Sequence, residues 1–211
     1  MHQQLPQQSS RYLGCRTRVK ASWENGIHPL IMRLFTALDV SPQVRGRLSD
    51  LARELQPLAR LRWSPEANLH ITTKFIGEWP AERLNEVRDA LPAMYPEPNV
   101  TVSGVGFFPN DRRPKVLFAR VEPSAELTAL AQSTDAALQI LGIAPEKHPY
   151  RPHVTLARIP EATRLHGLRE RLAELQPECF GTFPGTEYSF YESCAGRYTK
   201  LQTYSLSVLA R

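Results

Sequence analysis

The sequence lacks the features that would place the chain in a membrane or in an oxidising compartment. It has no run of about 18 consecutive apolar residues, the length that a membrane-spanning helix needs. Residues 1–10 are polar, so we expect no secretory signal peptide. The three cysteines, Cys15, Cys179 and Cys194, form no CxxC pair, which argues against a disulfide framework and is compatible with a reducing cytosol. We therefore expect a cytoplasmic protein with no membrane partner.

Several catalytic signatures are also missing. There is no GxxxxGK[ST] sequence, so an ATP-using P-loop mechanism is not indicated. There is no GxSxG sequence, and none of the cysteines lies in a nucleophile motif, which gives little support to a serine or cysteine hydrolase. Four histidines show no metal-ligand spacing such as HExxH: His2, His28, His148 and His166. We therefore expect no metal and no cofactor.

The composition is that of an ordinary globular chain with a basic charge balance. With 211 residues, 42% of them hydrophobic, the chain can form one domain or two closely packed lobes. The net charge of +5 and the pI of about 9.3 suit a polyanionic partner such as RNA, although many basic proteins bind no nucleic acid. Residues 1–28 are polar without a clear period, and we interpret them as an extension that is partly disordered or packed on the surface. Residues 29–211 contain no long linker and are expected to form a single bilobal domain.

Two segments share a His-x-Thr pattern in a strand-like context. Successive side chains of a strand point to opposite faces, so His70 and Thr72 share one face of the first segment. His153 and Thr155 share one face of the second. The residue between each pair is apolar and would point into the core. Each strand would thus present an imidazole and a hydroxyl side by side.

The two motifs belong to an internal repeat. His70 and His153 are 83 residues apart, and at the same offset the Leu-Phe pair at 34–35 aligns with the pair at 117–118. Each half has the pattern of a strand, a helix, a loop, the His-x-Thr strand and a closing helix. Such a duplication predicts a two-lobed domain with a pseudo-twofold axis, in which the two His-x-Thr strands face each other across a cleft.

The remaining patterns predict an α+β fold with seven or eight strands and four helices. Ser41 and Pro42 have the order that begins a helix. Residues 109–114 are expected to be a hairpin tip that exposes Arg112 and Arg113. The expected strands are 30–39, 69–77, 99–108, 115–121, 153–158 and further strands in the tail from 180 onward, and the expected helices begin at 42, at 80, at 125 and at 161.

A single His-x-Thr pattern is more often a buried histidine that bonds to a backbone carbonyl, but its duplication favours a site. The ordinary histidine pKa of about 6.5 allows one ring to be protonated while the other is neutral. One ring can then take a proton from water while the other donates a proton to a departing oxygen. Each threonine hydroxyl can hydrogen-bond to a phosphoryl oxygen. Three cations lie within reach in the sequence as candidate substrate contacts: Arg151, Arg158 and Lys74.

These segments resemble a known family. The doubled motif, the segment 33–39 (RLFTALD), the segment 69–77 (LHITTKFIG) and the segment 151–158 (RPHVTLAR) are similar to the two-histidine (2H) phosphoesterases. Within that superfamily, the chain resembles the bacterial RNA 2′,3′-cyclic phosphodiesterases, also called LigT-like proteins or 2′-5′ RNA ligases. The resemblance covers about residues 31–210 and includes the hairpin region around 105–118 and the segment 191–193.

The resemblance implies two antiparallel sheets that flank a central cleft, and an enzyme that opens 2′,3′-cyclic phosphate ends of RNA to 2′-phosphates. The reverse reaction would join tRNA halves or oligonucleotides through a 2′-5′ bond. By the family pattern, His70 is the proton donor to the leaving O3′ and His153 is the base that activates water. Thr72 and Thr155 match the positions that hold the phosphate. Thr73 departs from the pattern, because an apolar residue is more usual there.

Two alternatives remain open at the level of sequence. One stays in the superfamily, namely a phosphodiesterase for linear 2′-5′ oligonucleotides or small cyclic nucleotides. The other is a non-catalytic module that binds RNA ends. We expect a monomer, because one chain supplies both histidines.

Overall fold

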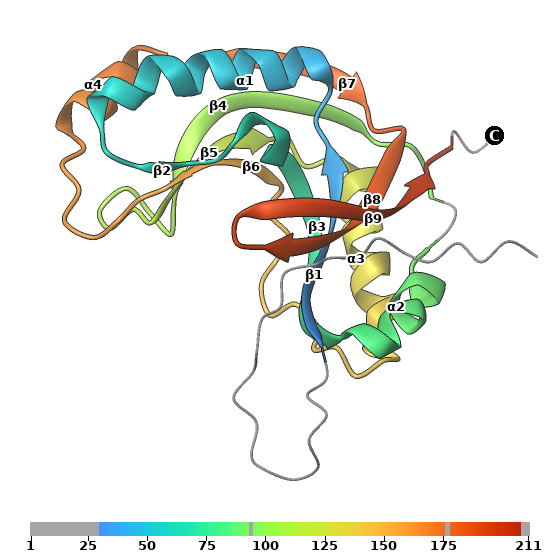
Figure 1. The fold of residues 1–211 in the computed structure, drawn as a ribbon. Helices are drawn as coiled ribbons and strands as arrows, with labels where there is room; N and C mark the ends of the chain where they lie inside the picture. Colours follow the sequence, from blue (N-terminus) through green and yellow to red (C-terminus); the bar gives the residue numbers. More distant parts are fainter. Residues whose placement is uncertain (1–29, 93–94, 176–177, 208–211) are drawn as a thin grey trace, which may run out of the picture.

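The structure is a computed structural model that describes residues 30–92, 95–175 and 178–207, so the predicted extension 1–28 lies outside the described residues. Within that part, helices are interspersed with strands as far as α4, and the strands β7, β8 and β9 follow it (Figure 1). The elements are β1 (Ile31–Asp39), α1 (Pro42–Leu55), η1 (Gln56–Leu58), β2 (Arg62–Trp63), η2 (Glu66–Asn68), β3 (His70–Pro80), η3 (Ala81–Arg83), α2 (Leu84–Ala90), β4 (Asn99–Phe108), β5 (Val116–Val121), α3 (Ala125–Gln139), β6 (His153–Arg158), α4 (His166–Glu174), β7 (Cys179–Pro184), β8 (Glu187–Cys194) and β9 (Arg197–Ser205).

The two long helices begin where the sequence predicts. The Ser41 hydroxyl accepts a hydrogen bond from the Val44 amide (3.3 Å), and Pro42 occupies the first turn, where its missing amide proton costs nothing. Ser124 caps α3 in the same way through the Leu127 amide (3.1 Å). The apolar face of each helix is buried in the core, at Val44, Leu48, Leu51 and Leu55 of α1 and at Leu127, Leu130, Ala131 and Leu138 of α3.

The strands pair in the order β7-β4-β5-β6-β3-β1-β8-β9, all antiparallel, with the short β2 on β6. The sheet thus consists of two four-stranded halves, β7-β4-β5-β6 and β3-β1-β8-β9. The two strands that carry the His-x-Thr motifs, β6 and β3, are neighbours at the centre of the sheet. The halves meet at the pairing of Ile71 in β3 with Val154 in β6. The predicted α+β fold with duplicated antiparallel halves is confirmed, and this one pairing makes the two halves continuous.

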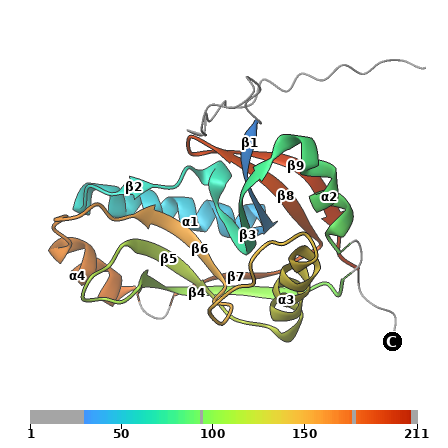
Figure 2. The same ribbon diagram turned by 90° about the horizontal axis from the view of Figure 1, so that it is seen from below.

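The two halves exchange helices. The helix α1 follows a strand of the first half but packs against β7 of the second, whereas α3 follows a strand of the second half and packs against β3 of the first. In Figures 1 and 2, α1 and α4 lie at one end of the molecule and α2 and α3 lie at the other. One apolar cluster continues through both halves, and it includes Leu34, Leu48, Leu117, Leu130 and Phe180. Because each of these helices packs against a strand of the other half, the two halves share one core.

A bulge in β3 explains the unusual Thr73. The pairing of β1 with β3 shifts register between Lys74, which lies opposite Thr36, and Thr72, which lies opposite Ala37. The extra residue Thr73 turns inward, where its hydroxyl and that of Thr36 share a buried hydrogen bond of 2.7 Å. A polar side chain is therefore accommodated at this position because a buried partner satisfies it.

The structure differs from the sequence-based expectations in several details. The predicted helix at 161–175 begins only at His166, and the predicted helix at 80 begins with the 3₁₀ turn η3. The predicted loop at 60–68 contains the short strand β2. Cys194 is disulfide-bonded, although the cysteine spacing argued against a disulfide framework. None of the helices in the described ranges is long and apolar enough to cross a membrane.

Candidate active site

The central strands bring the two His-x-Thr motifs together. Ile71 and Val154 are fully buried and lie opposite each other, so the motif side chains on either side of them point away from the core. Because the strands are antiparallel, the residue before Ile71 lies across from the residue after Val154. Each histidine therefore faces the threonine of the other motif, and the two histidines lie on a diagonal, roughly 7–8 Å apart by ordinary sheet geometry. Extended by one residue on each side of the Ile71–Val154 pair, the antiparallel register puts His70 across from Thr155 and His153 across from Thr72.

Both imidazole rings are oriented in the same way. His70 donates a hydrogen bond from Nδ1 to the carbonyl of Asn68 (2.7 Å), and His153 donates from Nδ1 to the carbonyl of Arg151 (2.8 Å). A carbonyl can only accept, so Nδ1 carries a proton in both rings. In each neutral ring, Nε2 is therefore the unprotonated nitrogen that can accept a proton.

Thr72 connects the first motif to the segment before the second. Its hydroxyl lies 3.1 Å from Nε2 of His70 and can donate to that nitrogen when the ring is neutral. Its backbone carbonyl accepts a hydrogen bond from the hydroxyl of Tyr150 (3.0 Å). Tyr150 thus fixes the segment that leads into His153 against β3.

Aromatic rings pack around His70. Its ring centroid lies 5.0 Å from that of Phe35 and 5.2 Å from that of Tyr198, which approaches edge-on. The turn between β8 and β9 also closes over this side, where the Asn68 amide donates to the carbonyl of Gly196 (2.6 Å). The β8–β9 hairpin therefore covers one side of the His70 ring.

An acidic side chain lies opposite His70 in the register of β1 with β3. Asp39 accepts hydrogen bonds from the Tyr191 hydroxyl (2.5 Å) and from Nζ of Lys200 (2.7 Å). Burial raises the pKa of this carboxyl, but the hydrogen bonds from Lys200 and Tyr191, together with the positive charges of Lys200 and Arg45, outweigh burial and lower it overall. Asp39 is therefore an anion beside His70.

The surroundings of His153 differ. Phe108 and Phe118 approach this ring edge-on, with centroids at 4.9 and 5.5 Å. The residue opposite His153 in the register is Arg120, whose Nε donates to the carbonyl of Val105 (2.9 Å) and whose guanidinium lies over the Phe118 ring. A cation thus occupies the position that an anion occupies beside the first histidine.

Burial lowers the pKa of both imidazoles below the ordinary value of 6.5. For His70, the hydrogen bond to the Asn68 carbonyl and the negative charge of Asp39 act against burial, while the charge of His153 adds to its effect. For His153, the hydrogen bond to the Arg151 carbonyl acts against burial. The anion beside His70 therefore favours the protonated state of that ring.

A cavity of about 690 Å³ opens beside the two motifs. Its walls include the β3 segment 72–75, Phe108 and His153. Side chains of α3 and of the segment 146–151 complete it. This volume lies within the range of about 300–1,000 Å³ that is typical of small-molecule sites.

The three predicted substrate cations occupy different places. Arg151 lines the cavity and is exposed. Arg158 is exposed at the end of β6, opposite Val116 and Arg62. Lys74 also lines the cavity, but its side chain is almost fully buried.

The amine of Lys74 is held by three oxygens of the second half. It contacts the Asp135 carboxylate at 2.5 Å, the Glu146 carboxylate at 3.3 Å and the carbonyl of Ala144 at 2.9 Å. These bonds fasten α3 and the loop after it to β3. Lys74 therefore joins β3 to the other half of the molecule, and its predicted contact with substrate stays a prediction.

Sequence reasoning missed three residues of this site: Asp39, Arg120 and Tyr150. The first two face a histidine only through the register of the sheet, for which the sequence contains no signal. Tyr150 lies three residues before His153, and that proximity was the available clue. Within the described ranges, no cluster of three His, Cys, Asp or Glu side chains could hold a metal ion.

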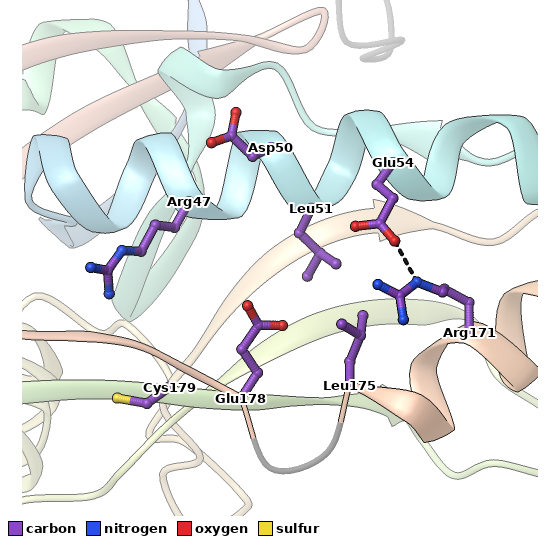
Figure 3. A pocket seen from close by; sticks show the side chains of 8 residues that line it. All are labelled: Arg47, Asp50, Leu51, Glu54, Arg171, Leu175, Glu178 and Cys179. Carbon is purple, nitrogen blue, oxygen red and sulfur yellow. Dashed lines mark hydrogen bonds and ion pairs between the residues drawn. The ribbon is translucent and has the colours of Figure 1, made fainter.

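A second cavity, of about 450 Å³, lies between α1, α4 and the start of β7 (Figure 3). Charged side chains of both signs line it, among them Arg47, Asp50 and Glu178. An ion pair between Glu54 and Arg171 crosses it and joins the two helices. None of the motif residues lines this cavity, whereas Thr72 and His153 line the first one.

The chain matches known proteins over most of its length. The family described as LigT like phosphoesterase matches residues 38–118 and 120–191. The RNA 2′,3′-cyclic phosphodiesterase of Archaeoglobus fulgidus is 34% identical over 129 residues, which cover 61% of this chain and 73% of that protein. The RNA 2′,3′-cyclic phosphodiesterase of Methanothermobacter thermautotrophicus is 30% identical over 184 residues, which cover 83% of this chain and 99% of that protein.

Solved structures share the fold. The protein TT0787 of Thermus thermophilus superposes with a TM-score of 0.68 at 28% identity, covering 82% of this chain and 97% of that one. E. coli LigT complexed with 3′-AMP superposes with a TM-score of 0.67 at 24% identity, covering 84% and 99%, and this likeness shows the fold alone. Since the family match spans more than half of the chain, and both halves of the repeat lie within it, the chain belongs to the LigT-like phosphoesterases of the two-histidine superfamily.

Proposed function

We propose that this protein hydrolyses 2′,3′-cyclic phosphate ends of RNA to 2′-phosphomonoesters by paired acid–base catalysis. The observation that carries the proposal is the diagonal placement of two imidazoles whose Nδ1 atoms are both held by carbonyls. Two relatives named RNA 2′,3′-cyclic phosphodiesterase, at 30 and 34% identity, support the substrate class. The net charge of +5 suits an RNA partner.

The proposed reaction divides the proton transfers between the two rings. Neutral His153 accepts a proton from water at Nε2 while the water oxygen forms a bond to phosphorus. Protonated His70 donates its Nε2 proton to O3′ as the P–O3′ bond breaks. The net change is addition of water across that bond, and the two rings then exchange protons with solvent to reset. The negative charge of Asp39 supports His70 as the acid, because it favours the protonated ring.

The two threonines hold the phosphoryl group in this proposal. Each hydroxyl stands two residues after a histidine and can donate to a non-bridging oxygen as negative charge develops there. The Thr72 hydroxyl, which contacts neutral His70, becomes free to do so when that ring is protonated and Nε2 no longer accepts. Arg151 and Arg158 are proposed as further contacts to the substrate.

The same groups would allow the joining of RNA ends through a 2′-5′ bond, in which a 5′-hydroxyl replaces water: its oxygen bonds to phosphorus, its proton goes to His153, and the P–O3′ bond breaks as O3′ takes the proton of His70. We further propose that the protein acts as a monomer, since one chain supplies both motifs.

The test is incubation of the purified protein with a nucleotide that ends in a 2′,3′-cyclic phosphate, in the presence of EDTA. We expect clean conversion to the 2′-phosphate. Formation of the 3′-phosphate would reverse the assignment of the leaving group. Turnover of linear 2′-5′ oligonucleotides alone would change the substrate class, and tight binding without turnover would favour a binding module.

A further inference from the structure

The face of the sheet that carries the two motifs continues beyond β6 onto β5. Arg120 of β5 lies directly opposite His153 in the register and therefore shares that face. Phe118 lies opposite Thr155 in the same register, two residues before Arg120. Both Arg120 and Phe118 lie outside the lining of the 690 Å³ cavity. This part of the motif face is therefore next to His153 but separate from the cavity.

The guanidinium of Arg120 is held in one position on this face. Its Nε donates to the carbonyl of Val105 on β4 (2.9 Å), and its central carbon lies 5.9 Å from the centroid of the Phe118 ring. Gly106 leaves the space for this arrangement, because a Cβ there would lie 2.9 Å from Cζ of Phe118 and 3.0 Å from Nη2 of Arg120. The neighbouring strand therefore both anchors the guanidinium and makes room for it.

The two terminal nitrogens of Arg120 remain available. Among the residues that the structure describes, Nη1 and Nη2 have no hydrogen-bond or ion-pair partner, and the side chain is exposed. The charged residue at the matching place beside His70, Asp39, is instead paired with Tyr191 and Lys200. A fixed guanidinium with two free nitrogens side by side matches two oxygens of a phosphate.

The position of the guanidinium decides which phosphate it can bind. Its bond to Val105 directs it away from β6 and toward β4. Neighbouring strands are about 4.8 Å apart, so the guanidinium lies roughly 10 Å from the midline between β3 and β6. A phosphate held between the two histidines is out of its reach. A neighbouring phosphate of the same RNA strand is within reach, because a whole nucleotide separates it from the reacting one.

We propose that Arg120 binds a backbone phosphate of the RNA strand that ends in the cyclic phosphate. This inference rests on the proposed function and specifies its substrate as the end of an oligonucleotide rather than a mononucleotide. The strand leaves the motifs across β6 and β5, and Arg120 donates from Nη1 and Nη2 to two oxygens of a phosphate upstream of the end. The contact favours longer strands without selecting a sequence, because phosphate contacts carry no base information.

The experiment compares adenosine 2′,3′-cyclic phosphate, which has only the reacting phosphate, with an adenylate trimer that has the same cyclic end. For Arg120→Ala, we expect KM for the trimer to rise about tenfold, as the loss of a charge-assisted contact would cause. KM for the mononucleotide is expected to change much less. The slope of log KM for the trimer against log salt concentration should fall by about 0.7, the contribution of one phosphate of a single strand.

Two further variants separate the contact from general charge effects. Arg120→Lys keeps the charge but not the paired nitrogens, so it is expected to keep the salt slope and to recover only part of the trimer KM. The matched control is Arg53→Ala, which also removes one positive charge, from an exposed side chain of α1 that is paired with Asp50. It is expected to leave the trimer KM and its salt slope unchanged. Equal rises of KM for the two substrates in Arg120→Ala, or no rise for either, would overturn the assignment.

A failure of the proposed function would be seen separately, as an absence of turnover of both substrates by the unmodified protein. In that case, fluorescence anisotropy with a labelled adenylate trimer that ends in a 2′-phosphate still tests Arg120, because binding of a backbone phosphate does not require catalysis. Weaker binding with a smaller salt slope in Arg120→Ala would support the contact, and equal affinities and slopes would overturn it.

Discussion

The two halves of the site have the same design but different neighbours. In each half, the histidine donates a hydrogen bond from Nδ1 to the carbonyl of the residue two positions before it, and a threonine lies two positions after it. The residue opposite the histidine differs, since it is Asp39 in the first half and Arg120 in the second. The duplication thus supplies two equal imidazoles, and the register of the neighbouring strand makes them electrostatically unequal. This difference supports the proposed division into acid and base.

The most severe loss should come from removing either ring. We expect His70→Ala and His153→Ala each to lower kcat for a cyclic-phosphate substrate by about 10²–10⁴-fold, because each proton transfer contributes that much to catalysis. The measurement is steady-state hydrolysis, with circular dichroism to show that the fold is kept. Near-normal rates in either variant would remove that histidine from the mechanism.

The two halves also differ at a buried position next to each motif: the first half has the cation Lys74, and the second half has Ala157 at the equivalent position of the repeat. Lys74→Met leaves the partly buried carboxylate of Asp135 without its cation, and we expect a loss of about 3 kcal/mol in the free energy of unfolding, as for other broken buried ion pairs. Urea denaturation measures the loss. The double change Lys74→Met with Asp135→Asn is expected to recover part of it, and additive losses would show that the pair is not coupled.

The third prediction breaks the electrostatic difference between the half-sites. The charge of Asp39 raises the pKa of His70, so Asp39→Asn is expected to lower that pKa. Because the acid must be protonated, activity is lost as pH rises through the pKa of His70, and the alkaline limb of the kcat profile should move to lower pH. We expect a fall of about five- to tenfold in kcat at pH 7.5, equivalent to about 1–1.4 kcal/mol.

Lys200→Met provides the opposite change, because it removes a positive charge that contacts Asp39. The alkaline limb should then move to higher pH. Shifts of both variants in one direction would show that Asp39 acts on His70 through packing rather than through charge.

The mildest effect concerns stability. Burial lowers the pKa of both histidines in the folded state, while the unfolded chain keeps the ordinary value near 6.5. The stabilisation is therefore complete above about pH 6.5 and is lost as pH falls from there through the folded-state pKa values. Urea unfolding at pH 7.5 and pH 5 should show this loss. His70→Gln and His153→Gln should each reduce the difference between the two pH values, and an unchanged difference would exclude burial as its cause.

The elements that the sequence predicts well are those whose signals are local. The helix starts at Ser41 and Ser124 follow from capping residues, and the faces of the motif strands follow from the alternation around Ile71 and Val154. The helix starts near 80 and 161 were predicted too early, because the segments before α2 and α4 form a 3₁₀ turn and a loop. A helical pattern of apolar residues does not distinguish these from the first turn of an α-helix.

The repeat, the four motif residues and the side of each strand on which they lie follow from the amino-acid sequence, because strand periodicity and a fixed offset are properties of the chain. Which residues stand opposite them depends on the packed fold. The bulge at Thr73 arises from the pairing of two strands, and it brings Asp39 opposite His70 and Phe75 back to the cavity. Lys74 became a structural cation because its partner Asp135 lies on a helix of the other half. Register and long-range pairing are set by how the whole sheet packs, and no local pattern encodes them.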